Sequence, residues 1–185
     1  MQIDPDLIKA CLAKKRAAQN QLYKELFSYL MNICIRYKND YDTAGASLNC
    51  IFLKILDNLD KFREEDSFIP WIKRIAVNHL IDEYRKEKRE KEKLSYLEEV
   101  SNNESKSSSI HEAEAMMDSE YLLTMIRELP QMTAKVFNLY AIDGYKHREI
   151  GELLQMSENT SKWHLSEARK QLKVKLERFH EKEMI

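Results

Sequence analysis

Apolar residues recur at helical spacing in three stretches of the first half of this 185-residue chain. The stretches run from Gln21 to Tyr37, from Leu48 to Leu59, and from near Phe68 to about Lys93. Spacings of three and four residues between apolar positions predict amphipathic α-helices. In the third stretch we expect the buried stripe to consist of Ile72, Ile75, Ala76, Leu80 and Tyr84.

Two further helices are predicted after residue 113, and each is followed by a proline or a glycine that terminates it. The first runs from Glu114 to Leu129 and stops at Pro130. The second runs from Thr133 to Ile142 and is ended by Gly144, whose missing Cβ suits a left-handed cap. With the two helices described next, they predict a compact four-helix domain.

The residues from Lys146 to Lys175 are typical of a helix-turn-helix. The first helix is expected from His147 to Leu154, where apolar residues repeat at steps of three and four. The second begins after Ser157, whose hydroxyl can accept a hydrogen bond from an unpaired amide of the first turn. Its inward face is expected to consist of Leu165, Ala168, Leu172 and Leu176.

Trp163 is expected on the outer side of this second helix, about 160° from Leu165 at ~100° per residue. Asn159, Lys162 and His164 flank it. Such side chains near the start of a helix suit recognition of base edges in the DNA major groove. The alternative is that Trp163 packs on a neighbouring helix and that the charged residues are only solvated.

A polar, serine-rich run at residues 101–109 separates the two groups of helices. It has no apolar period and too few apolar residues to pack, so it predicts a linker. Three Gly, three Pro and a charged fraction of 33% disfavour a sheet-rich fold. We therefore predict an all-α protein in which two small helical domains, residues 1–93 and 114–185, are joined by a flexible linker at residues 94–113. The C-terminal domain contains the helix-turn-helix.

The formal net charge is −1, but the charges are unevenly distributed. Basic residues exceed acidic ones from Trp71 to Lys93, and acidic residues dominate from Leu94 to Ser119. The position of the charges, more than their sum, decides nucleic-acid binding. This distribution favours two nucleic-acid-facing ends with an acidic segment between them. That segment is either a mimic of nucleic acid that occupies a basic channel or a plain solvated tether.

Aromatic and basic residues are interleaved around the start of the third helix. The loop from Asp60 to Ser67 contributes Lys61, Phe62 and Arg63, and the helix adds further basic residues. Single-stranded bases stack on aromatic rings while cations pair with the backbone phosphates, so the pattern fits a single-strand surface. The alternative is that Phe68 and Trp71 are core residues.

We expect no cofactor, metal ion or membrane insertion. Cys11, Cys34 and Cys50 are odd in number and lack metal-type spacing, and the five histidines are scattered. No apolar run approaches the ~20 residues that span a bilayer, and no signal-peptide pattern is present. The adjacent acidic residues 64–66 diverge from one another, which disfavours a metal-dependent nuclease. These features predict a cytoplasmic protein without catalytic residues.

Two blocks of motifs occur in order around the linker. The first is Phe68-x-x-Trp71-Ile72-x-x-Ile75-Ala76-x-Asn78-x-x-Ile81-Asp82-x-x-Arg85, and the second includes Leu129-Pro130, Gly144-Tyr145, Arg148-Glu149-Ile150 and Ser157-x-Asn159-Thr160-Ser161-Lys162. In this order they resemble the extracytoplasmic-function sigma factors of the sigma-70 family. The resemblance implies a promoter-specificity subunit of bacterial RNA polymerase that is monomeric when free. It also implies core RNA polymerase, promoter DNA and an anti-sigma factor as partners.

The resemblance further assigns residues to three surfaces. The −35 duplex would be faced by Glu158, Asn159, Lys162, Trp163 and His164, with Arg148 and Arg169 nearer phosphates. The melted −10 element would be faced by Lys61, Phe62, Arg63, Lys73, Arg74, Asn78 and Arg85. Core polymerase would be bound by Leu48, Asn49, Phe52, Leu53 and Lys54.

Three departures from the family pattern are evident. Ala46, Asn49 and Cys50 replace an Asp and a Gln-Glu pair that most members use to bind polymerase. Lys146 replaces the usual Ser or Thr cap, at an expected cost of about 1 kcal/mol of local stability. Ser161 replaces an inward Val, which we expect to loosen the helix pair slightly.

A stand-alone transcriptional regulator is the alternative function. It would use the same helix-turn-helix, bind duplex DNA without polymerase and favour a palindrome. The block from Phe68 to Arg85 argues against it, because a sensing or dimerisation module has no need of this motif.

Overall fold

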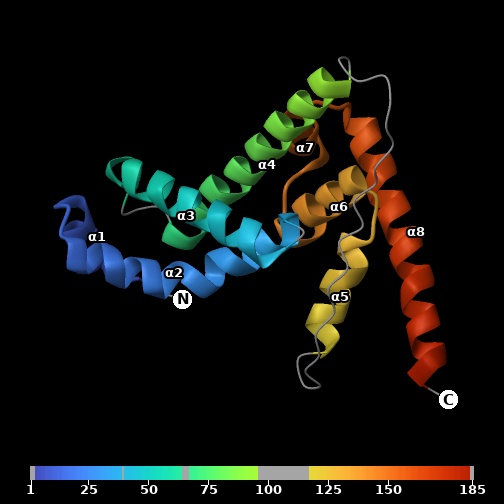
Figure 1. Ribbon diagram of the computed structural model, residues 1–185, viewed down its shortest axis with the longest axis horizontal. Helices are drawn as coiled ribbons and strands as arrows, with labels where there is room; N and C mark the ends of the chain where they lie inside the picture. Colours follow the sequence, from blue (N-terminus) through green and yellow to red (C-terminus); the bar gives the residue numbers. More distant parts are fainter. Residues whose placement is uncertain (1–2, 39, 64–66, 96–116, 184–185) are drawn as a thin grey trace. The chain divides into compact units, whose positions relative to one another are not determined.

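The structure is a computed structural model that describes residues 3–38, 40–63, 67–95 and 117–183. Every regular element in these ranges is helical (Figure 1), which confirms the all-α prediction. The chain divides into two compact units, Met1–Ser101 and Asn102–Ile185. The predicted linker, apart from Leu94 and Ser95, lies outside the described residues, as do the acidic residues 64–66.

The first unit begins with a helix that the periodicity analysis missed. Helix α1 (Pro5–Leu12) is capped by Asp4, whose carboxylate accepts a hydrogen bond from the Asp6 amide at 2.9 Å. Proline at the first helical position is preorganised for this start. Its buried residues Leu7, Ile8 and Cys11 have helical spacing, but the segment precedes the first stretch in which that spacing is sustained. The Asp-Pro pair was the signal that could have found it.

Three longer helices form the core of the first unit. They are α2 (Arg16–Tyr37), α3 (Tyr41–Asp57) and α4 (Phe68–Ser95), with a 3₁₀ turn η1 (Leu59–Lys61) between the last two. Each of the three packs against the other two. Their fully buried side chains are mainly aliphatic and include Leu22, Leu26, Leu30, Leu48, Ile51, Ile55, Ile72, Leu80 and Ile81.

Helix α4 is buried over a wider face than its sequence predicted. Of the expected stripe, Ile75 and Tyr84 are only half-buried, whereas Val77 and Ile81 are completely buried. The reason is that α4 contacts both α2 and α3, so its inward face covers two helix seams. The prediction assumed a single narrow seam.

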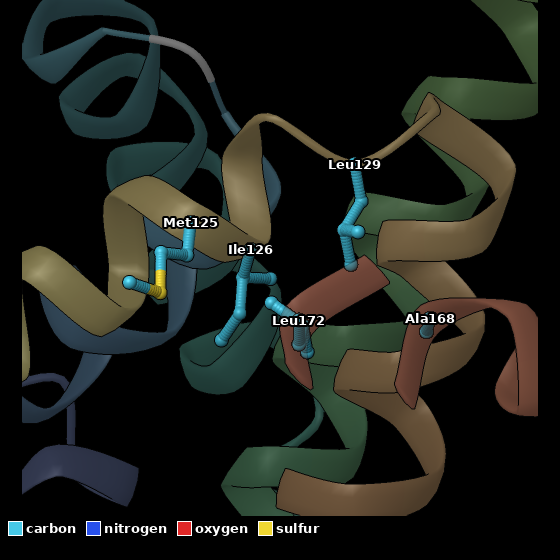
Figure 2. Packing of buried hydrophobic residues seen from close by; sticks show 5 residues of the cluster. All are labelled: Met125, Ile126, Leu129, Ala168 and Leu172. Atoms are coloured by element: carbon cyan, nitrogen blue, oxygen red, sulfur yellow. The ribbon is translucent and has the colours of Figure 1, made fainter. Parts of the chain in front are cut away.

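The second unit holds α5 (Met117–Arg127), α6 (Gln131–Phe137), η2 (Asn138–Ile142), α7 (His147–Leu154) and α8 (Glu158–Glu183). Helices α5, α6 and α7 all pack on α8. Figure 2 shows five buried side chains of this core, drawn from α5, its following loop and α8. They are Met125, Ile126, Leu129, Ala168 and Leu172.

The segment η2 is a π-helix, which interrupts the continuous helix predicted from Thr133 to Ile142. The Asp143 amide donates to the Asn138 carbonyl, five residues back, at 2.9 Å. A π-turn accommodates one more residue per turn than an α-helix does. Gly144 follows at φ +81°, so the predicted left-handed ending is present.

No helix among the described residues is long and apolar enough to cross a membrane. In the same ranges no group of three or more His, Cys, Asp and Glu residues is placed to hold a metal ion.

Candidate nucleic-acid interfaces

The turn between α7 and α8 is tightly built. The Ser157 hydroxyl accepts a hydrogen bond from the Thr160 amide at 3.0 Å, as its capping role predicted. Gln155 adopts a left-handed conformation at φ 56°, which ends α7. A Cβ atom on Gly151 would lie 2.7 Å from the Met156 carbonyl oxygen, so the backbone of α7 approaches the turn more closely than a side chain permits.

Helix α7 begins without a side-chain cap from Lys146. The Lys146 amide instead donates to the Glu149 carboxylate at 2.7 Å, which is one half of a capping box. Glu149 therefore offsets part of the loss of stability that is expected where the usual Ser or Thr cap is missing.

The start of α8 presents Trp163 to the surface. The side chain is 60% exposed, whereas Ser161, Leu165 and Ala168 on the opposite side are buried. Asn159 is also exposed. Within the second unit Trp163 is thus not a core residue, and the helix has the orientation that its sequence predicted.

Two of the predicted −35 cations are paired with acidic residues one helical turn away. Lys162 Nζ lies 2.7 Å from a Glu158 oxygen, and Arg148 Nε lies 3.3 Å from a Glu152 oxygen. The hydrogen bond from Lys162 also lowers the pKa of Glu158. All four side chains are at least half exposed, and such surface pairs are weak, so phosphate or a base can displace the carboxylates.

His164 faces α6. Its Nδ1 atom lies 3.0 Å from Oγ1 of Thr133, a residue of α6 that is 2% exposed. Burial lowers the pKa of His164, so the imidazole is neutral at neutral pH. Of the residues assigned to −35 bases, His164 is the one that forms a hydrogen bond with another helix of its own domain.

His147 forms a similar bond across the helix-turn-helix. Its Nδ1 atom lies 2.9 Å from Oγ of the completely buried Ser161. The His147 ring also stacks on Tyr140, with ring centres 4.4 Å apart, and the Arg169 guanidinium lies 5.9 Å from the centre of the Tyr140 ring. The Ser161 hydroxyl thus links α7 to α8, a contact that the inward Val of the family pattern could not make.

A surface pocket of about 250 Å³ lies in the first unit, between the end of α3 and one face of α4. It is smaller than the pockets of about 300–1,000 Å³ that enclose drug-sized ligands, and it suits a single base-sized group. Rings, amides, cations and a carboxylate line it, from Lys54, Asn58, Lys61, Trp71, Ile75, Asn78, His79 and Asp82.

The pocket contains two of the predicted −10 residues, Lys61 and Asn78. Arg85 lies beside it, because its Nη1 atom is 3.4 Å from a carboxylate oxygen of the pocket residue Asp82. Sequence reasoning did not assign Asp82 to the site. The spacing of the five α4 residues in the pocket, at steps of four, three, one and three, was the signal for a shared helix face.

The other predicted −10 residues are not in the pocket. Lys73 lies about 160° around α4 from the pocket residue Ile75 at ~100° per residue, so the structure places it on the opposite side of the helix. Arg63 and Arg74 are exposed outside the pocket lining.

Phe62 packs in an aromatic cluster at the pocket's edge. Its ring centre lies 5.1 Å from that of Phe68 and 5.4 Å from that of Trp71. Phe68 is buried and belongs to the core, while Trp71 is half-buried and also lines the pocket. Phe68 therefore fits the interpretation as a core residue, whereas Trp71 fits the interpretation as part of a surface that can stack on a base.

A polar network behind the pocket fixes α4 against α2 and α3. Glu83 accepts a hydrogen bond from the Ser47 hydroxyl at 2.7 Å and pairs with Lys38 at 3.1 Å. Although burial opposes the effect, these bonds lower the pKa of Glu83. His79 Nε2 lies 3.3 Å from the other Glu83 oxygen, and burial lowers the pKa of His79. The network sets the rotation of the helix that carries the pocket residues.

The residues assigned to polymerase binding divide into two groups on α3. Leu48 and Phe52 are buried in the core of the first unit, so they support the surface from beneath. Asn49, Leu53 and Lys54 are exposed, and Leu53 is a large apolar side chain at 60% exposure. Of the residues assigned to polymerase binding, only the second group is therefore exposed.

Ala46 and Cys50, two of the three α3 residues that depart from the family pattern, lie on the exposed side of the same helix. The third, Asn49, accepts a hydrogen bond from the Tyr23 hydroxyl of α2 at 2.9 Å. Its side-chain oxygen is thus held by a neighbouring helix.

Comparison with known proteins agrees with this arrangement. Residues 22–90 match the family Sigma-70 region 2, and residues 119–172 match the family Sigma-70, region 4. The chain is also 25% identical to RNA polymerase sigma factor YlaC of Bacillus subtilis (strain 168), over 93% of this chain and 99% of the relative. The chain belongs to the extracytoplasmic-function sigma factors of the sigma-70 family.

Two solved structures share the fold of this sigma factor. The sigma factor RpoE in complex with the anti-sigma factor NepR from Bartonella quintana matches with a TM-score of 0.59 at 19% identity, over 85% of this chain and 96% of that one. CnrH in complex with the cytosolic domain of CnrY matches with a TM-score of 0.50 at 18% identity, over 92% and 95% of the two chains.

Proposed function

We propose that this sigma factor directs core RNA polymerase to promoters by reading a −35 duplex with the start of α8 and a melted −10 strand with the pocket of the first unit. The observation that carries the proposal is the exposure of Trp163 on a capped helix of a helix-turn-helix, within the match to region 4. The pocket supports the second half, since it lies within the match to region 2.

In the −35 interface, α8 enters the major groove with Asn159, Lys162 and Trp163 toward base edges. Glu158 holds Lys162 until DNA is bound and then accepts from a cytosine amino group or remains paired. Arg148 and Arg169 lie on flanking parts of the unit and bind phosphates.

In the −10 interface, one unstacked base enters the pocket. The Trp71 ring supplies a stacking surface, and the Asn78 amide and Asp82 carboxylate supply hydrogen bonds to the base edge. Lys61, in η1, provides positive charge for a neighbouring phosphate.

Core polymerase docks on the exposed side of α3, where Leu53 provides an apolar contact and Asn49 and Lys54 provide polar ones. The protein works in the cytoplasm with polymerase and performs no chemistry of its own. An anti-sigma factor is a further partner, because the sigma factors RpoE and CnrH, which share this fold, are seen in complexes with NepR and CnrY.

Run-off transcription with purified core polymerase tests the proposal. Genomic fragments from the source organism are transcribed with and without the protein, and we expect protein-dependent transcripts from discrete start sites that share a two-part motif. Absence of such transcripts, together with tight duplex binding that does not need polymerase, would instead support the stand-alone regulator. The matches to both sigma-70 regions do not favour that alternative.

A further inference from the structure

We infer that Thr133 and His164 act as a positioning pair that orients the Trp163 indole for base contact, and that His164 itself reads no base. The inference rests on the proposed function, since it refines how the −35 interface is built. His164 is then no longer counted among the residues that read bases. Thr133, a buried residue of α6 that cannot reach DNA, is added as a residue that supports the interface from within the domain.

Thr133 is placed to hold the His164 ring rather than to contact a ligand. It lies in the first turn of α6 and is 2% exposed, and its Oγ1 atom lies 3.0 Å from His164 Nδ1. A buried hydroxyl keeps its hydrogen-bond partner because loss of the partner leaves it desolvated and unpaired. The bond therefore fixes the imidazole in one orientation against α6.

The fixed imidazole in turn contacts the indole. The two ring centres are 4.8 Å apart and the planes meet at 71°, an edge-to-face arrangement that aromatic pairs favour. Trp163 is 60% exposed, so without this contact the indole samples several rotamers in water. Ordering it in advance reduces the entropy that binding to DNA would otherwise cost.

A second bond of the same type acts one turn earlier on α8. His147 of α7 is bonded to the buried Ser161 hydroxyl at 2.9 Å. The turn that carries Lys162 and Trp163 is therefore bounded on both sides by hydroxyl–imidazole bonds, one to α7 and one to α6. These two bonds resist rotation of α8 about its axis, while the Thr133 bond alone reaches the indole.

The experiment is a double-mutant cycle on the full chain, assayed as holoenzyme binding to a promoter and to the same promoter with a substituted −35 element. Thr133→Val removes the hydroxyl and keeps the shape, Thr133→Ser keeps the hydroxyl, and Trp163→Ala removes the indole. We expect Thr133→Val to reduce −35 discrimination by about fivefold, the equivalent of one ordinary hydrogen bond. Thr133→Ser should restore it, and Thr133→Val should have no further effect when Trp163 is already Ala.

A spectroscopic measurement separates positioning from a general loss of stability. In a Trp71→Phe background Trp163 is the one tryptophan of the chain. Time-resolved fluorescence anisotropy of the free protein should show faster local rotation of the indole in Thr133→Val than in Thr133→Ser. Thermal unfolding of both variants identifies any change that is merely structural.

The outcomes are distinct. If Trp163→Ala leaves discrimination unchanged, the proposed −35 role of Trp163 fails, and the positioning pair fails with it. If Trp163→Ala reduces discrimination but Thr133→Val adds the same loss in both backgrounds, the positioning role alone is overturned. If His164→Asn changes the preferred base at one −35 position while Thr133→Val does not, His164 reads that base directly and the inference is wrong.

Discussion

At the scale of single residues, the structure differs from the sequence prediction mainly in the contacts of three histidines. His79, His147 and His164 each lie beside an oxygen of another residue, and burial lowers the pKa of all three. Sequence reasoning treated His164 as a base reader and left His147 without a role. The partners Ser161 and Thr133 were not identified, because contacts between helices do not follow from the spacing within one helix.

Replacement of Trp163 by Ala should weaken recognition of the −35 element. We expect a loss of about tenfold in promoter discrimination, within the range of one specific base contact. Competition binding of holoenzyme with wild-type and −35-substituted promoters measures it. Affinity for core polymerase serves as the control and should not change, since Trp163 lies on α8 of the second unit and the proposed polymerase surface lies on α3 of the first.

Replacement of Asn78 by Ala should weaken capture of the melted −10 strand. The change removes an amide from the pocket, and we expect about a fivefold loss in binding of a single-stranded −10 oligonucleotide by holoenzyme. Glu90→Ala, an exposed change on the same helix, is the matched control. Equal affinity of both variants for the oligonucleotide would show that the base is bound elsewhere.

At the scale of helices, agreement between sequence and structure depended on local signals. The bounds of α7 and the start of α8 matched the prediction because they depend on local residues. Gln155 ends α7 in a left-handed conformation, and the Ser157 side chain caps the start of α8. Helix α1 was missed because its short apolar face, unlike that of α7, is not part of a longer motif such as the helix-turn-helix, and η2 was missed because an added residue changes hydrogen bonding without changing composition. The pocket was only partly predicted, since α3, η1 and α4 meet through tertiary packing.

Loss of the α8 cap should destabilise the second unit. Ser157→Ala removes the hydroxyl that accepts from the Thr160 amide, and we expect about 1 kcal/mol less unfolding free energy. Denaturant titration followed by circular dichroism measures it. Ser166→Ala, an exposed serine in the interior of the same helix, should have a much smaller effect, and equal losses for the two variants would contradict the capping role.

At the scale of the whole molecule, the formal net charge of −1 is the sum of a basic stretch of sequence, from Trp71 to Lys93, and an acidic one, from Leu94 to Ser119. In the proposed function the protein binds DNA through local groups of Lys and Arg side chains, three of which (Arg85, Arg148 and Lys162) are paired with carboxylates in the structure. On this proposal each of these cations exchanges a carboxylate for a phosphate or a base when DNA is bound. We therefore expect recognition to depend on salt.

Promoter binding by holoenzyme should weaken steeply with salt. Cations that bind phosphates release condensed counterions, so the logarithm of the affinity falls linearly with the logarithm of salt concentration. Titrations between about 50 and 200 mM salt measure the slope. A flat response would mean that phosphate contacts contribute little.

The folded chain should lose stability as the pH falls from about 7.5 to 5.5. The pKa values of His79, His147 and His164 lie below the ordinary 6.5 in the folded state, so the unfolded chain binds protons first. Their stabilising contribution is complete above about 6.5 and declines below it. Denaturant unfolding at several pH values measures the decline, and constant stability across this range would contradict it.

The π-helical segment Asn138–Ile142 should tolerate the deletion of a single codon. Loss of one codon from an ordinary helix rotates everything after it by about 100°, which turns its apolar face away from the core. Here the lost residue would be the surplus one, so the segment would close into a regular α-helix while α6 and α8 kept their core. Tyr140 would no longer lie over His147. A single-codon deletion at this place should therefore yield an allele that accumulates as folded protein yet selects promoters poorly.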